Sequence, residues 1–422
     1  MTHDSSSSSI VMATLASPAS VYHSEPLFFD RAKYLGHDLE QLRNGDVVSG
    51  TVYLNSLSDF KGLFAADIPH QFRVQHSLHI QPKQIAPHLS ETTRLMYRLS
   101  DHIFGDAPLL REDTAHLSNI FPITIQALSA LNHVVDTDEV YGPSGAPVLL
   151  NFGTLTFKGG SITTRNTVLT LRAETLIFDA VPGHKPYHIG ILGEDGAMGK
   201  AGKDGTSAPG QANAGADRPP SSPGICNGVG NGGQGSAGAD GGDGVPGEPG
   251  DDGLPSLPAH ITFMAVSPAN QQSLVVYTRS GSGGSGGPGG KGGDGQQGGR
   301  GGKGCDSGCQ GTNGGNGGNG GTSGNGGDGG TGGNGVDGQN MYVTVPRDYV
   351  QNVITTRYVA PYGQGGIPGQ GGNGGAGGYG GVGGKHSSNG NGGTHGNGGN
   401  PGTTGKTGTL QGTPGTIYVN GI

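Results

Sequence analysis

The residues best suited to chemistry in this chain are three cysteines, Cys226, Cys305 and Cys309. Cys305 and Cys309 stand four positions apart in CDSGC, a spacing that could close a small disulfide loop in an oxidising compartment. No second cysteine pair or suitably spaced histidine accompanies them, as a structural zinc site would require. The pattern favours a Cys305–Cys309 disulfide, or free thiols, over a metal centre.

Residues 20–150 are rich in histidine, the side chain most often used for acid–base and metal chemistry. These histidines are His70, His76, His79, His88, His102, His116 and His133. His76 and His79 fall in a segment that predicts a strand, where residues three apart face opposite sides and cannot chelate one ion. We therefore expect scattered surface histidines.

No catalytic signature is present. The chain lacks GxSxG, HExxH, P-loop and cysteine–histidine motifs, and GxGxxG-like strings arise by chance in such glycine-rich sequence. The adjacent carboxylates Asp251 and Asp252 predict a solvated loop, with a weak cation site left open. The sequence predicts a protein that is not an enzyme, with no catalytic residues, no cofactor and no metal.

Charge and hydropathy exclude two classes of partner. The net charge is −8, whereas phosphate binding needs clustered Lys and Arg, so nucleic acid is not expected. No apolar run approaches the roughly 20 residues that span a bilayer. The N-terminus, MTHDSSSSSIVMATLASPAS, lacks the basic region of a clear signal peptide. We expect an extracellular protein, or part of a surface or viral particle, released by another route.

Glycine divides the chain into two parts. Of the 90 glycines, 12 lie in the first 190 residues and 78 in the last 232. From Gly281 to Gly338 every third residue is Gly at 17 of 20 positions, and from Gly363 to Gly408 at 15 of 16. A period of three predicts polyproline-II helices, whose bare glycine edges allow backbones to approach and hydrogen-bond.

Two other interpretations compete. Gly/Ser linkers are usually random coil, but a linker has no reason to keep phase for nearly 60 residues. A collagen triple helix needs more proline than these blocks contain. The collagen interpretation applies best to residues 193–253, which include GVPGEPGDDG.

The interruptions of the period predict where the glycine helices turn. Many triplets contain a second glycine next to the one that keeps the period of three. Before Cys305 this second glycine precedes the periodic one, and after Cys305 it follows it, as expected if the chain has reversed direction. We expect turn tips at four places. They are Gln296-Gln297, Cys305 to Cys309, Thr322-Ser323 and Lys385 to Asn389.

Short segments rich in β-branched residues separate the glycine blocks and predict strands. They lie within 155–180, 260–280 and 340–360 and in TIYVNG at the end. Earlier in the chain, 47–54 and 71–80 predict strands, whereas Ser90 to Asp106 and Thr114 to Asp136 predict helices, the second divided or kinked by Pro122.

The expected fold class is therefore mixed: a small α+β N-terminal domain, then a β-strand layer with three stacked bundles of glycine-rich polyproline-II helices. The predicted boundaries are 1–20 disordered N-terminus, 21–150 α+β attachment or oligomerisation domain, 151–190 strand segment, 191–258 first glycine-rich excursion, 259–280 strands, 281–339 second excursion, 340–362 strands, 363–416 third excursion and 417–422 final strand.

The blocks NGGNGGNGGTSGNGGDGGTGGNG and GGNGGAGGYGGVGG resemble the polyglycine-II sandwich proteins, such as the tail-fibre adhesins of T-even-like phages and the snow flea antifreeze protein. The resemblance covers about 40% of the chain, and neither relative has comparable intervening strands. In the adhesins, loops joining glycine helices bind the host receptor; in the antifreeze protein, a flat face binds ice. By this resemblance the candidate contact residues here are Gln296, Gln297, Asp306, Ser307, His386, Ser387 and Ser388.

The leading functional hypothesis is a non-enzymatic extracellular structural or adhesive scaffold, self-associating into a fibre or surface layer. The alternative is a receptor-binding adhesin or toxin-like module of the phage tail-fibre type. It would recognise a cell-surface glycan or protein receptor through the turn tips.

Overall fold

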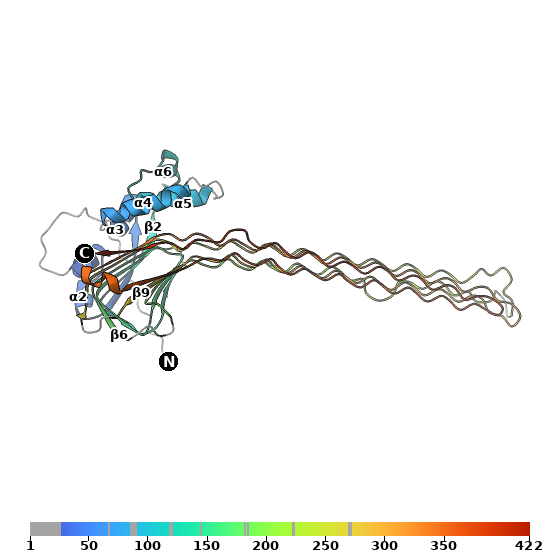
Figure 1. Ribbon diagram of the computed structural model, residues 1–422. Helices are drawn as coiled ribbons and strands as arrows, with labels where there is room; N and C mark the ends of the chain where they lie inside the picture. The colour runs from blue at the N-terminus through green and yellow to red at the C-terminus, as the bar shows by residue number, and fades with distance from the viewer. Residues whose placement is uncertain are drawn as a thin grey trace.

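The computed structural model describes residues 27–65, 68–84, 91–117, 121–143, 146–180, 183, 185–221, 224–268 and 272–422. The segment 1–20, for which disorder was expected, lies outside the described residues. Figure 1 shows a head of strands and helices from which a long arm of glycine-rich segments extends.

The larger sheet of the head has seven strands in the order β1-β2-β4-β6-β8-β10-β12. Only the β1–β2 pair is antiparallel; the other pairs are parallel. The strands are β1 (Val47–Leu54), β2 (Ile123–Val135), β4 (Val148–Lys158), β6 (Leu169–Ala180), β8 (Ala259–Val266), β10 (Met341–Val345) and β12 (Ile417–Gly421).

The smaller sheet has five parallel strands in the order β11-β9-β7-β5-β3. They are β3 (Glu139–Tyr141), β5 (Ile162–Arg165), β7 (Ile189–Leu192), β9 (Leu274–Arg279) and β11 (Val353–Tyr358). From β2 onward the chain alternates between the two sheets, so each turn adds one strand to each. The result is a coil of parallel strands, in which every turn packs against the previous one.

Apolar side chains fill the space between the sheets. Phe152, Phe157, Phe178, Ile261 and Val276 are fully buried there, in one continuous cluster. Their burial follows from the alternation of side chains along each strand, which sends every second residue inward.

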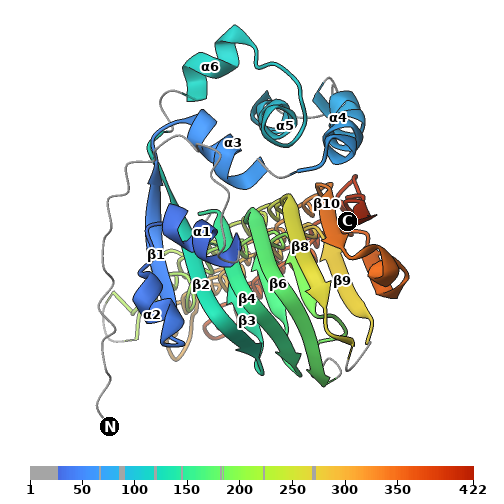
Figure 2. The ribbon, with the colours of Figure 1, turned by 90° about the vertical axis from the view of Figure 1, so that its left-hand side faces the viewer.

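Helices cover the outer face of the seven-stranded sheet (Figure 2). Phe60, Phe64 and Phe104 of this layer pack on Leu149 and Tyr342 of the sheet. The helices are α1 (Leu27–Tyr34), α2 (Leu39–Arg43), α3 (Leu57–Ala65), α4 (His70–Gln84), α5 (Glu91–Phe104) and α6 (Arg111–Leu117), with a 3₁₀ helix η2 (Arg347–Asn352) between β10 and β11. The head therefore has three layers: helices, large sheet and small sheet.

The arm is formed by the connections that lead from the small sheet back to the large sheet. After β3 and β5 the connection is short, but after β7, β9 and β11 it runs outward and returns. The outbound segments are 193–218, 281–304 and 359–384, and the return segments are 231–258, 312–340 and 390–416. The first tip contains the described residues 219–221 and 224–230; the other tips are 305–311 and 385–389.

Backbone hydrogen bonds join these segments at every third residue. In the first outbound segment the amides of Gly196, Gly199 and Gly202 donate to the second outbound segment at 2.8 Å. Further bonds join outbound segments to return segments. The second outbound segment bonds to the first and third outbound segments and to the first and second return segments. The arm is thus two layers of three segments, which continue the two sheets of the head.

The glycines are required because the segments are so close. A Cβ atom added to Gly283 would lie 2.0 Å from the carbonyl oxygen of Gly333, and one on Gly284 would lie 2.0 Å from that of Ala197. Segments in the middle of the arm therefore carry two glycines in three residues. The first outbound segment, which bonds to fewer neighbours, mostly carries one.

The predicted fold class is wrong. The chain is an α/β protein built on a mostly parallel seven-stranded sheet and a parallel five-stranded sheet. No polyproline-II bundles are identified among the described residues. Three separate bundles do not form because the hydrogen bonds run between the excursions. The predicted 21–150 domain contributes β1, β2 and the start of β4 to the sheet that the later strands complete.

Two secondary-structure predictions for the N-terminal part are also wrong, whereas β1 and α5 are confirmed. The predicted strand 71–80 lies in helix α4, since Phe72, His76 and Ile80 recur at helical spacing and are buried on one face. The predicted helix 114–136 is divided: α6 ends at Leu117, and β2 follows Pro122. The β-branched run after Pro122 favours a strand.

Two adjacent glycines test the packing of the arm. Gly393→Ala places a Cβ 1.9 Å from the carbonyl oxygen of Gly318, whereas at Gly392 the nearest atom is 3.6 Å away. We expect Gly393→Ala to destabilise the arm locally by about 1–3 kcal/mol and Gly392→Ala to be nearly neutral. Hydrogen exchange of the arm amides should quicken only in Gly393→Ala; equal effects would contradict this packing.

Candidate functional site

The three tips of the arm come together at its far end. A disulfide between Cys226 and Cys305, with Cα atoms 5.9 Å apart, joins the first tip to the second. The third tip is joined to the second by Lys385. Its amide donates to Asp306 Oδ1 at 2.9 Å, and its Nζ donates to the carbonyl oxygen of Gly308 at 2.8 Å. The arm therefore ends in one cross-linked cap.

The predicted Cys305–Cys309 disulfide is wrong. Cys305 pairs with Cys226, which is 79 residues away, and the Cys309 thiol is free and exposed. Proximity in sequence favoured Cys309, but the fold brings the tips of two separate excursions side by side. The available signal was weak: Cys226 lies between two blocks of glycine triplets, and Cys305 replaces an in-phase glycine.

The cap contains five of the predicted contact residues, and they differ in exposure. Asp306, His386 and Ser388 are exposed, and Ser387 is half-buried. Ser307 is only 7% exposed, and its hydroxyl donates to the carbonyl oxygen of Gln310 within the turn. The exposed three can reach a partner, whereas Ser307 holds the turn.

Gln296 and Gln297 lie in the straight part of the second outbound segment, so the turn predicted there is wrong. Opposite them the first outbound segment contains one additional residue, because Ala208 bonds to Asp294 but Ala212 bonds to Gln297. The Gln296 side chain fills this irregularity: its Nε2 donates to the carbonyl oxygen of Pro209 at 3.0 Å, and its Oε1 accepts from the Ala239 amide at 3.0 Å.

Ser323 likewise lies within a straight segment, which makes the predicted Thr322-Ser323 turn wrong. Its hydroxyl donates to the carbonyl oxygen of Gly372 at 2.8 Å. Of the four interruptions, only Cys305–Cys309 and Lys385–Asn389 are turns; the other two supply side-chain hydrogen bonds inside the arm.

Side chains on the return layer form a regular array that sequence reasoning missed. Asn316 Oδ1 accepts from the Asn391 amide at 2.9 Å, and Asp243 Oδ1 accepts from the Asn325 amide at 2.7 Å. At Asp240, hydrogen bonds from Thr322 lower the pKa of the carboxyl group. These short side chains align neighbouring segments, which accounts for the repeated Asn and Asp after GG.

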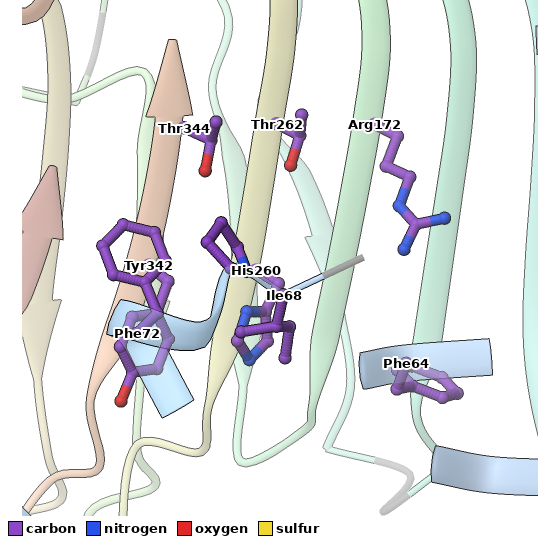
Figure 3. Close-up of a pocket in the computed structure, with 9 residues that line it drawn as sticks. Phe64, Ile68, Phe72, Arg172, His260, Thr262, Tyr342 and Thr344 are labelled. Carbon is purple, nitrogen blue, oxygen red and sulfur yellow. The ribbon is translucent and has the colours of Figure 1, made fainter. Parts of the chain in front are cut away.

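A small hollow lies in the head between the helices and the large sheet (Figure 3). Three adjacent strands form one side, where Arg172 of β6, Thr262 of β8 and Thr344 of β10 stand in register. His260 and Tyr342 line the same side, facing Phe64, Ile68, Pro69 and Phe72 of the helical part.

A buried hydrogen-bonded chain next to this hollow fixes His76. Its Nδ1 lies 2.8 Å from the Tyr342 hydroxyl, and its Nε2 lies 3.1 Å from Ser100 Oγ. Ser100 donates its proton to Gln339 Oε1 at 2.7 Å. Nε2 must therefore carry the proton that bonds Ser100, so Ser100 and His76 are not arranged as nucleophile and base. The prediction that His76 is a surface residue is wrong; it is fully buried.

His260 lies beside that chain, stacked between Phe104 and Tyr342 with ring centroids 5.0 and 4.9 Å away. Burial, and secondarily the nearby His76 and Arg172, holds the pKa of His260 well below its usual value, so the imidazole is neutral. Its Nε2 has no hydrogen-bond partner among the described residues. The hollow is best described as the joint between the helical layer and the sheet.

Comparison of the chain with protein-family models, curated proteins and solved structures gives no match. Within the described ranges, no group of three or more His, Cys, Asp or Glu residues is placed to hold a metal ion. In that same part of the chain, no helix has the length and apolar character needed to cross a bilayer.

The disulfide gives a direct test of the cap. Cys226→Ser should destabilise the tips by about 2–4 kcal/mol, because the two excursions lose their cross-link. Amide exchange should quicken in 219–221, 224–230 and 305–313. Cys309→Ser is the matched control and should change nothing. Mass-spectrometric detection of a Cys305–Cys309 link in the native protein would contradict this arrangement.

Proposed function

We propose that this protein is a non-enzymatic extracellular structural or adhesive scaffold, in which the head anchors or organises the arm and the arm projects the cap. One observation carries this proposal: six chain segments are bonded to one another through backbone amides along the whole arm. Such a connection resists bending, because bending would break several hydrogen bonds at once.

The arm is also fixed at both ends. At its base each outbound segment continues a strand of the small sheet, and each return segment leads into a strand of the large sheet. At the far end the Cys226–Cys305 disulfide holds two excursions together. A structural disulfide persists in oxidising surroundings, which supports a place outside the cell.

A second candidate function is receptor binding by the cap, as an adhesin or toxin-like module. The convergence of the three tips favours it, because His386, Ser388 and Cys309 are exposed there within one cross-linked unit. The partner would be a cell-surface glycan or a protein receptor.

The scaffold proposal can be tested by shortening the arm in register. The deletions 199–204, 244–249, 285–290, 325–330, 364–369 and 400–405 together remove two triplets from every segment, and the remaining hydrogen-bonded pairs stay aligned. Electron microscopy should show a straight arm in both proteins, shorter by about 20 Å in the variant at ~3.3 Å per residue.

The control is deletion of 285–290 alone, which leaves one segment two triplets shorter than its neighbours and should disorder the arm near the cap. Arms that bend at variable angles in the wild-type protein would overturn the scaffold proposal.

The second candidate has its own test. Replacing Lys385 to Asn389 by a plain glycine turn should abolish binding to a glycan array or to a panel of cell surfaces, while the arm keeps its length. The control Lys291→Gln lies far from the cap and should bind normally. Unchanged binding by the tip variant would eliminate receptor recognition through this tip.

A further inference from the structure

The two layers of the arm expose two faces of different chemistry. In the middle segments, one residue in three keeps a side chain, while the glycines face neighbouring segments. The side chains of the second outbound segment therefore project from one face of the arm, and those of the second return segment project from the opposite face. We call them the outbound face and the return face.

Cations gather at the far end of the outbound face. Arg300, Lys303 and Lys385 are exposed there. Two carboxylates lie beside them: Asp217 Oδ1 accepts the Lys303 amide at 2.6 Å, and Asp306 Oδ1 accepts the Lys385 amide at 2.9 Å. We call Arg300, Lys303 and Lys385 the basic patch.

Next to the basic patch stands the most exposed large apolar side chain of the described residues. Tyr379 is 75% exposed, and its carbonyl oxygen accepts the amide of Gly301, which places it beside Arg300. Exposed aromatic and arginine side chains on a rigid surface are typical of protein interfaces.

Carboxylates lie on the return face between the head and the middle of the arm: Asp252 and Asp337 lie near the head, Asp328 lies farther out, and Asp243 and Asp240 lie around the middle. The first return segment contributes Asp240, Asp243 and Asp252; the second contributes Asp328 and Asp337. We call these five the acidic patch. Lys406 is the single cation among the described residues of the third return segment. Beyond Asp240, toward the cap, the return face carries Asn and Thr side chains and no charge from the middle segment.

We propose that the arms of two copies of this chain pack antiparallel, with the basic patch of one copy on the acidic patch of the other. The orientation follows from the charges. Antiparallel packing brings the distal cations level with Asp252 and Asp337 near the head and leaves the proximal Asp195 opposite the uncharged part of the return face. Parallel packing would set Asp195 against the acidic patch, which is repulsive.

The contact joins different faces, so it is heterologous and continues from copy to copy. It would build a stack of arms, which extends the proposed scaffold function to a fibre or surface layer. This inference depends on that function but can fail separately from it.

Sedimentation of the full chain tests the contact. The wild-type protein should associate at low salt and dissociate as salt rises, because exposed charges are screened. Arg300→Gln with Lys303→Gln should weaken association roughly tenfold. Asp252→Asn with Asp328→Asn should do the same, and asparagine keeps the Oδ1 acceptor that Asn334 already uses in this array. Lys158→Gln changes an exposed cation of the head, outside the arm, and is the control that should associate like the wild type.

Two outcomes would overturn the contact. One is a wild-type protein that stays monomeric at low salt and high concentration. The other is association that neither salt nor the four charge changes affects. If monomers instead bind an acidic polysaccharide such as heparin through Arg300 and Lys303, the patch serves a different partner. Monomers with straight arms in the microscope would refute this contact and leave the scaffold proposal standing.

Discussion

The constraint on which this structure depends is the approach of one backbone to another without side chains between them. In the arm, amide and carbonyl groups of neighbouring segments meet at 2.8–2.9 Å over most of its length, and a single methyl group at most contact positions would collide with a carbonyl oxygen. Glycine loses more conformational entropy on ordering than any other residue. The arm can be ordered only because nearly every triplet gains bonds to neighbouring segments, so no segment would be stable alone.

The head makes that arrangement possible. Its two sheets present β7, β9 and β11 side by side and receive β8, β10 and β12 side by side. Each glycine segment therefore leaves or returns already adjacent to the segment that it must bond. The apolar core between the sheets, with Phe152, Phe157 and Phe178 fully buried, provides the stability that glycine cannot. The disulfide at the cap then fixes the end at which no sheet holds the chain.

Since the interior of the arm is glycine, side chains are confined to its outer surfaces and its tips. Their chemistry is therefore the chemistry of a surface: short Asn and Asp side chains that align segments, a basic patch, an acidic patch and a cap. The buried polar chain through His76 and Tyr342 has a different role, because it connects helix α4 to strand β10 beside the base of the arm. Both features are consistent with a protein whose function lies in shape and contact.

Of the four turns that the sequence predicted only two exist, but it determined by itself where glycine recurs and where the strands between the glycine blocks lie. These features are local, because a period of three or two is set by backbone geometry. It could not show that strands alternate between two sheets, or that 71–80 is helical, since Phe72 and His76 fit either period until the packed face is known. Only the tertiary structure decided that Cys305 pairs with Cys226 rather than Cys309. It also decided that Gln296 and Ser323 serve inside the arm. Both outcomes depend on segments some 50–80 residues apart being adjacent, which no local pattern records.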